Sequence, residues 1–288
     1  GQMAPDVDAL AAALDTTPTE TLARLKANYD GYHFSEGSPD IYNPFSLLSS
    51  FASGKIASYW FGSGTPTGLI NLLQESNWEI SDLEGREADE DEFDAPTEDM
   101  PTPLPMLYQA GYLTIKSYDP LTCSYTLGIP NAEVARGFSK SLVRRAAGAQ
   151  VGEFNGLVRT ISRSLRAHDM EGALQATKAF MAGMPYHLGS HSERGFQTTF
   201  WLIFTLLGAQ IETEVKTATG RVDAVVKAPD AIYVVEFKYE KSAQEALAQI
   251  DERGYLLPYA ADGRKLYKVG VNFSEKTQTI GEWIIEEG

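Results

Sequence analysis

Two carboxylates and one lysine lie close together in the final third of the chain, on segments with the composition of β-strands. Residues 232–238 form an apolar run that ends in Glu236, Phe237 and Lys238. Because side chains alternate across a strand, Glu236 and Lys238 would share one face. Burying a carboxylate and an ammonium there is costly unless something binds them. Taken alone, this triplet is more simply explained as an exposed ion pair at a strand end.

Asp223 favours a metal site instead. It lies in a second β-prone run, residues 220–226, and a turn separates that run from the first. In an antiparallel hairpin Val225 would pair with Val234, and Asp223 would face Glu236. Facing carboxylates repel each other, and Mg²⁺ or Mn²⁺, which bind oxygen ligands, would relieve the repulsion. A register shifted by one residue would put the acids on opposite faces, and the sequence leaves both registers open.

Two further polar residues are candidates for the same site. Glu193 begins the apolar stripe of an expected helix over residues 193–207, so it could point toward the core. Ser190, three residues earlier, gives an equally good explanation, because the two residues would form a capping box. Gln249 flanks the apolar face of an expected helix that begins near Ser242, and it could lean toward the preceding strand.

The elements expected in the C-terminal part alternate between helix and strand. The helix at 193–207 is followed by three strands, a helix and a last strand, at residues 211–217, 220–226, 232–238, from 242, and 266–271. This order predicts an α/β unit with a mixed sheet flanked by helices.

The preceding residues are mainly helical in pattern. Helices are expected over residues 6–29 with a break at 16–18, from Pro44, after Asn131, and over 151–182. A hairpin at 107–127 next to the helix after Asn131 suggests a winged-helix-like unit. The chain as a whole is therefore expected to be α+β. Its expected parts are a helical region ending in an acidic loop, a winged-helix-like and helical region, and the α/β domain, at residues 1–100, 101–185 and 186–288.

The composition indicates where in the cell such a site would act and bears on whether the chain binds nucleic acid. The chain has 288 residues, one cysteine, and no apolar run near the roughly 20 residues that cross a bilayer. We therefore expect no membrane association and a reducing, cytoplasmic location. The formal charge of −15, from 39 acidic and 24 basic residues, is opposite to the usual balance of a nucleic-acid-binding protein. Part of the excess is an acidic run at residues 82–94, which is typical of a solvated, mobile loop.

The C-terminal motifs resemble those of the PD-(D/E)xK nuclease superfamily. The resemblance covers about residues 186–285 and rests on residues 220–223, 236–238 and 246–250 and on Tyr255. It looks most like a branch that is fused to a predicted AAA-type ATPase in bacterial proteins. Upstream motifs are also similar to that branch, at residues 29–34, 42–45, 107–115 and 129–134.

The resemblance implies a restriction-endonuclease-like fold and metal-dependent hydrolysis of phosphodiester bonds in DNA or RNA. Asp223 and Glu236 would bind Mg²⁺ or Mn²⁺, and Lys238 would orient the attacking water and stabilise the charged transition state. Glu193 would match the acid on the family's first helix, and Gln249 the polar residue after the strand motif.

The sequence departs from that branch in one respect, because it contains no phosphate-binding loop of the form G-x-x-x-x-G-K-[ST]. No ATP site is therefore expected in this chain, and the missing ATPase region or another protein would be a partner. Together with the acidic balance, this absence supports an alternative in which the nuclease fold is a non-catalytic binding or regulatory module. Metal binding distinguishes the two hypotheses, because only the catalytic one requires a divalent cation.

Overall fold

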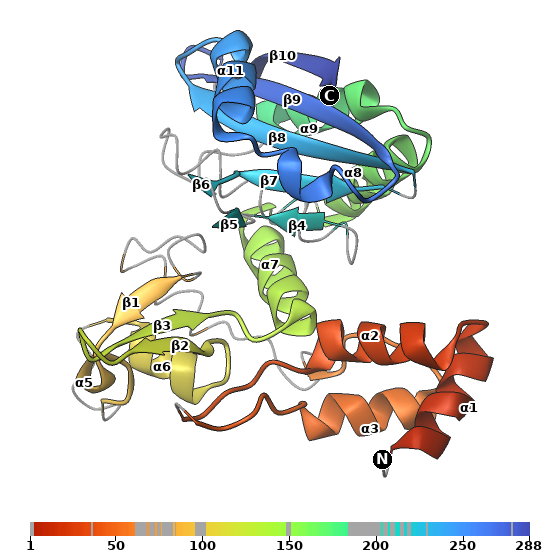
Figure 1. The fold of residues 1–288 in the computed structure, drawn as a ribbon, viewed down its shortest axis with the longest axis vertical. Coiled ribbons are helices and arrows are strands. Elements are labelled where there is room, and N and C mark those ends of the chain that lie inside the picture. The colour runs from red at the N-terminus through yellow and green to blue at the C-terminus, as the bar shows by residue number, and fades with distance from the viewer. Residues whose placement is uncertain are drawn as a thin grey trace. The chain divides into compact units, whose positions relative to one another are not determined.

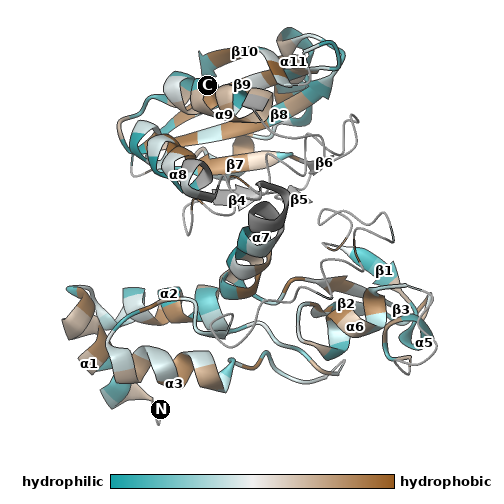
Figure 2. Cartoon of the chain, turned by 180° about the vertical axis from the view of Figure 1, so that it is seen from behind, coloured by the Kyte–Doolittle hydropathy of each residue, from teal (hydrophilic) through white to brown (hydrophobic). Residues whose placement is uncertain are grey.

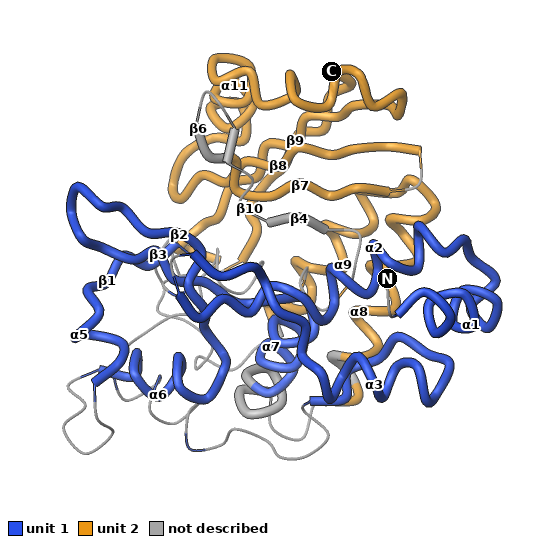
Figure 3. Tube along the Cα trace, turned by 60° about the horizontal axis from the view of Figure 1, so that its bottom comes forward, with its two compact units in different colours: residues 1–141 blue, residues 142–288 orange. Residues whose placement is uncertain are grey.

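The computed structural model describes residues 3–35, 37–60, 68, 73, 76, 83, 85–95, 102–147, 151–183, 203, 207, 211–213, 216–217, 220–228, 230–277 and 279–288. Figures 1 and 2 show the chain from opposite sides. It divides into two compact units, residues 1–141 and residues 142–288 (Figure 3). The finer division into three parts, at 1–100, 101–185 and 186–288, stays a prediction.

The first unit begins with three helices that share an apolar core: α1 (Ala4–Leu14), α2 (Pro18–Tyr29) and α3 (Pro44–Ser53). Each helix has a proline in its first turn, where the missing amide hydrogen leaves no helical bond unmade. Thr17 and Asn43 cap α2 and α3 by accepting hydrogen bonds from backbone amides. Leu10, Leu25 and Tyr29 are buried between the helices. The expected break near residue 17 and the helix start at Pro44 are confirmed.

The same unit contains an antiparallel sheet in the order β1–β3–β2, formed by β1 (Arg86–Ala88), β2 (Thr114–Asp119) and β3 (Ser124–Gly128). Two short helices precede the β2–β3 hairpin, α5 (Glu90–Phe93) and α6 (Leu104–Gln109). The hairpin is followed by α7 (Ala132–Ala147), whose first turn is capped by the Asn131 side chain. The hairpin and the capped helix are confirmed, whereas their assignment to a winged-helix fold stays a prediction.

The acidic run at residues 82–94 is not a mobile loop in the part that the structure describes, which corrects the expectation. Arg86–Ala88 pairs with β3, and the Glu92 side chain accepts a hydrogen bond from the Asp89 amide at the start of α5. Phe93 is buried and contacts Tyr108 and Tyr125 edge to face. The packing of this aromatic ring therefore orders a segment whose charge alone indicated a solvated loop.

The second unit contains a five-stranded mixed sheet in the order β10–β9–β8–β7–β4. These strands are β4 (Ile211–Thr213), β7 (Ala224–Lys227), β8 (Ala231–Tyr239), β9 (Lys265–Ser274) and β10 (Thr279–Glu287). β8 and β9 are parallel, and the other neighbouring pairs are antiparallel. β5 (Lys216–Thr217) and β6 (Gly220–Arg221) form a separate small ladder. The mixed sheet of the α/β class is confirmed, and β10 is an additional strand that the sequence did not predict.

Helices cover both faces of this sheet. α8 (Val151–Arg166) and α9 (Met170–Gly183) lie on one face, and α11 (Ala243–Arg253) lies on the other (Figures 1 and 2). Ser242 and Glu245 form the expected capping box of α11, which is followed by a short 3-10 helix, η5 (Leu257–Tyr259). The expected helix at 193–207 falls largely on residues outside the described part. None of the described helices is long and apolar enough to cross a bilayer.

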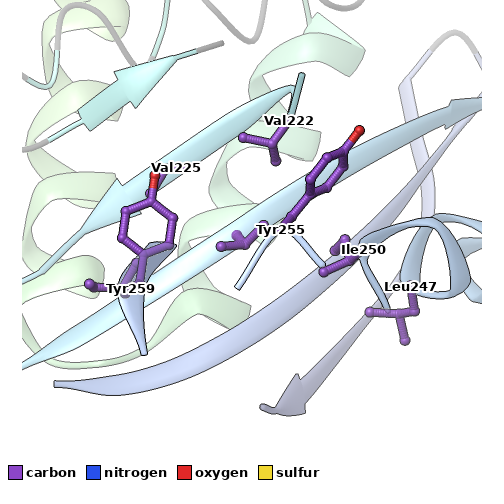
Figure 4. Packing of buried hydrophobic residues seen from close by; sticks show 8 residues of the cluster. Val222, Val225, Leu247, Ile250, Tyr255 and Tyr259 are labelled. Carbon is purple, nitrogen blue, oxygen red and sulfur yellow. The ribbon is translucent and has the colours of Figure 1, made fainter. Parts of the chain in front are cut away.

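A buried core joins α11 to the sheet (Figure 4). Its strand residues include Val225, Ile232 and Val234, and its helix residues include Leu247 and Ile250. Each such side chain removed from water contributes about 1.5–3 kcal/mol. Alternate residues of a strand share one face. Glu236 and Lys238 therefore lie on the same side of β8 as Ile232 and Val234, the side that faces α11.

Candidate active site

The β7–β8 hairpin has the register that places Asp223 beside Glu236. Val225 pairs with Val234 in the antiparallel ladder, so the residue just before β7 lies next to the end of β8. The Asp223 side chain reaches across, because its Oδ2 accepts a 2.8 Å hydrogen bond from the Phe237 backbone amide. The predicted register is confirmed, and the register shifted by one residue is excluded.

Glu236 is buried at this position, with only 3% of its surface exposed. Its Oε1 accepts hydrogen bonds from Lys238 Nζ, at 3.4 Å, and from Gln249 Nε2. Its Oε2 is also buried but has no hydrogen-bond partner among the described residues. One oxygen of this carboxylate is therefore held by the protein, while the other lacks the partner that buried polar atoms normally have.

Gln249 links the helix to the two charged residues of the strand. Its amide nitrogen donates to Glu236, and its Oε1 accepts a 2.5 Å hydrogen bond from Lys238 Nζ. Glu236, Lys238 and Gln249 thus form a closed triangle of hydrogen bonds. The prediction that Gln249 leans toward the strand is confirmed, and the charged end of Lys238 has a fixed position.

Burial governs the protonation of the Glu236 carboxyl. Removal from water raises the pKa of Glu236 from its ordinary 4.5 to about 8, and repulsion from the Asp223 carboxylate acts in the same direction. The Lys238 ammonium opposes both effects and lowers the pKa. Without a bound cation, Glu236 therefore carries a proton over much of the neutral range.

Gly270 is a residue of this region that the sequence analysis did not single out. It lies on β9 opposite Glu236 in the parallel ladder. A Cβ atom at this position would come within 2.2 Å of the Ala243 carbonyl oxygen and 3.0 Å of Leu247 Cγ, both on α11. The absence of a side chain lets the helix approach closely enough for Gln249 to reach the strand. A glycine inside a strand is the sequence signal for such a close approach.

The residues present fit a hard divalent cation. Two carboxylates lie together, and one buried carboxylate oxygen is unpartnered. Mg²⁺ is often held by only one or two carboxylates, with water and substrate phosphate completing its coordination. No cluster of three or more His, Cys, Asp or Glu side chains with metal-binding geometry occurs within the described residues. The predicted fifth site residue, Glu193, lies outside them.

Comparison with known proteins identifies the class of this domain. Residues 191–283 match the PD-(D/E)XK nuclease superfamily and form a domain of that superfamily. The sequence is also similar to a protein from Azotobacter chroococcum mcd 1, the "Uncharacterized protein in vnfD 5'region", with 30% identity over 302 residues. The match covers 99% of this chain and 56% of that protein, so the chain spans about half the length of its relative. No solved structure matches the chain significantly.

The superfamily expected from the motifs is thus confirmed for the C-terminal domain. Nothing in these matches concerns an ATPase fusion. The individual roles of Asp223, Glu236, Lys238 and Gln249 stay predictions, although four of the five expected residues lie in the described part and the contacts above bring them together.

Proposed function

We propose that this chain hydrolyses phosphodiester bonds in nucleic acid with the help of Mg²⁺ or Mn²⁺ held by Asp223 and Glu236. The observation that carries the proposal is the pairing of these two carboxylates at the end of the β7–β8 hairpin, with one buried oxygen left unpartnered. Membership of residues 191–283 in a nuclease superfamily supports the reaction class and the substrate class.

Each of these side chains would have a separate role in such a reaction. When bound, the cation would polarise a phosphate oxygen and lower the pKa of a coordinated water molecule. Lys238 would place its ammonium where negative charge develops on the phosphate, and a fixed donor of this kind contributes several kcal/mol in a water-poor site. Gln249 would hold Lys238 in place through its 2.5 Å hydrogen bond. Glu193 stays a predicted additional acid.

A cleavage assay with labelled DNA and RNA tests the proposal. The full chain is expected to cut one or both in Mn²⁺ or Mg²⁺ and to be inactive in EDTA. Asp223→Ala and Lys238→Ala are each expected to lower the rate by about 100-fold or more. Lys276→Ala, an exposed lysine in the β9–β10 turn, is the matched control and should leave the rate unchanged. Metal-dependent cleavage that persists in both site variants contradicts the proposal.

A non-catalytic binding or regulatory module is the second candidate function. The net charge of −15 favours it, because a polyanionic substrate is repelled by an acidic protein. In this case the binding partner would be another protein or an ATPase region. Calorimetric titration with Mn²⁺ separates the candidates, because the module needs no cation and the phosphodiesterase requires one.

Four broader assignments belong to the same proposal. The upstream motifs support kinship with the branch fused to an AAA-type ATPase, and the missing phosphate-binding loop supports the absence of an ATP site in this chain. The winged-helix-like unit and the cytoplasmic location also stay predictions from the sequence.

A further inference from the structure

One side of α8 carries a row of exposed arginines. Arg159, Arg163 and Arg166 are spaced four and three residues apart, so they project from the same side of the helix. All three are solvent-exposed. At a rise of about 1.5 Å per residue, the row extends over roughly 10 Å. We call these three residues the α8 arginine row.

The positive charge of this row is not neutralised within the described part of the chain. None of the three guanidinium groups makes a hydrogen bond or an ion pair there. The sequence around them contains no aspartate or glutamate from residue 154 to residue 168, although the chain has 39 acidic residues. The row is therefore a local positive surface on an acidic protein.

The opposite side of α8 is anchored in the protein. Ile161 and Leu165 are buried, and α9 packs alongside the helix. The large exposed hydrophobic side chains of the described residues all lie outside α8. A helix that binds a membrane surface needs exposed apolar residues beside its basic ones. The described side chains of α8 do not supply them, so this surface suits a polyanion in water better than a lipid bilayer.

We propose that the α8 arginine row binds the phosphate backbone of nucleic acid. The choice of partner rests on the proposed function. Phosphates follow one another about every 3.4 Å of axis along a strand, so a row of roughly 10 Å spans about three of them. Guanidinium groups bind phosphate oxygens in a two-pronged manner that suits such contacts.

The row is a second contact surface, distinct from the carboxylate site. α8 and α11 cover opposite faces of the sheet (Figures 1 and 2), and Glu236 and Lys238 lie on the α11 face through their bonds to Gln249. Nucleic acid bound along α8 would be retained close to the domain while the site itself engages one strand. This arrangement would let a chain of net charge −15 hold a polyanion.

The salt dependence of binding tests the proposal. The affinity of the full chain for a fluorescent duplex of about 20 base pairs is measured in EDTA, which prevents cleavage, over a range of salt concentrations. Each phosphate contact contributes about 0.9 to the slope of log K against log salt. The variant Arg159→Gln/Arg163→Gln/Arg166→Gln is expected to lower the slope by about 2 to 3.

Two matched variants separate contact from bulk charge. Replacement of the same three arginines by lysine should keep most of the slope, because the charges remain. Lys26→Gln/Lys265→Gln/Lys276→Gln removes three exposed charges from scattered positions and should change the slope by less than about 1. Circular dichroism reports whether each variant folds. If the triple glutamine variant is unfolded, Arg163→Gln alone should lower the slope by about 1.

An unchanged slope in a folded glutamine variant overturns the proposal, as does failure of the parent chain to bind the duplex. Tighter binding to phosphatidylserine vesicles than to the duplex, lost in the glutamine variant, also overturns it in favour of a membrane partner. The two proposals fail separately. A reduced slope without any cleavage by the parent would support the arginine row and reject the phosphodiesterase. Cleavage that depends on Asp223, together with an unchanged slope in the triple glutamine variant, would support the phosphodiesterase and reject the arginine row.

Discussion

Glu236 combines burial, a raised pKa and an unpartnered oxygen in one side chain. Its Oε2 is buried without a hydrogen-bond partner in the described part of the chain, and such an atom costs about 1–3 kcal/mol. Lys238 and Gln249 satisfy only the other oxygen. A cation bound between Glu236 and Asp223 would supply the missing partner and remove their repulsion. We therefore interpret the destabilising arrangement as one that is retained for binding.

The first prediction concerns Glu236→Gln. Burial raises the pKa of the folded-state carboxyl to about 8 from 4.5, so the folded protein binds its proton more tightly than the unfolded chain. The stability from this proton is present below pH 4.5 and is lost as the pH rises toward 8. The uncharged amide avoids that loss. In EDTA, the variant should gain stability relative to the parent between pH 5 and about 8.5, measured by urea unfolding.

Glu252→Gln, at an exposed carboxylate on α11, is the control for simple loss of one negative charge, and it should not reproduce the gain in stability expected for Glu236→Gln. A constant difference for Glu236→Gln would mean that the carboxyl is not destabilised by burial. The same Glu236→Gln protein should be inactive in the cleavage assay, because it lacks one of the proposed cation ligands.

The second prediction concerns Gln249, which holds the proposed ligand and Lys238 together. Gln249→Ala should lower Mn²⁺ affinity or cleavage by about 10–100-fold, the usual effect of removing a residue that orients a metal ligand. Gln244→Ala, an exposed glutamine on the same helix, should have the activity of the parent. Metal titration and single-turnover cleavage measure the two effects. Equal activity of both variants would remove Gln249 from the site.

At the scale of elements, the features that depend on local sequence were predictable. The capping box of α11 follows from Ser242 and Glu245 alone, whereas the observed β7–β8 register was one of two possibilities that the sequence left open. Packing between distant segments was not predictable. Phe93 orders the acidic run by contacts with Tyr108 and Tyr125, which a charge count does not reveal.

The site shows the same division. Asp223, Glu236 and Lys238 were found because their pattern requires only two adjacent strands. The sequence indicated that Gln249 could lean toward the strand, but it could not predict the hydrogen bonds to Glu236 and Lys238, because these depend on how closely α11 approaches β9. That approach is set by Gly270, whose importance appears only when the helix is in place. β10 was missed because β9 had been taken as the last strand of the sheet.

The third prediction concerns this approach. Gly270→Ala would place a Cβ atom 2.2 Å from the Ala243 carbonyl oxygen, so α11 must shift. Such overpacking destabilises a protein by about 1–3 kcal/mol, and it should also weaken Mn²⁺ binding because Gln249 moves. Gly152→Ala in α8 has open space around it and should be neutral or stabilising by up to about 1 kcal/mol. Urea midpoints and metal titrations of both variants check this, and a Gly270→Ala protein with unchanged metal affinity would contradict it.

At the scale of the whole molecule, the charge distribution matters more than its sum. The chain is acidic overall, yet residues 134–168 contain seven arginine and lysine residues and a single acidic residue, Glu153. A net charge of −15 therefore does not exclude a polyanionic substrate, because binding depends on the local field. The acidic excess is consistent with a low affinity for nucleic acid away from this segment.

The fourth prediction links cation binding to the stability of the fold. A ligand that binds only the folded chain stabilises it by about 2.7 kcal/mol at a hundred times its dissociation constant. Mn²⁺ must displace the proton from Glu236, whose pKa is raised to about 8, so its stabilising effect should grow from pH 6.5 to 8.5. Thermal unfolding with and without Mn²⁺ measures the effect. Asp223→Asn should abolish it, and a stabilisation of equal size in that variant would place the cation elsewhere.

The most direct test of the shared cation is a crystal of the full chain grown with Mn²⁺ and measured at a wavelength where manganese scatters anomalously. We predict an anomalous peak between the carboxylates of Asp223 and Glu236, within coordination distance of both, which disappears in Asp223→Asn. A peak held by other residues, or no peak at Mn²⁺ concentrations that support cleavage, would contradict the assignment of these two side chains as the metal ligands.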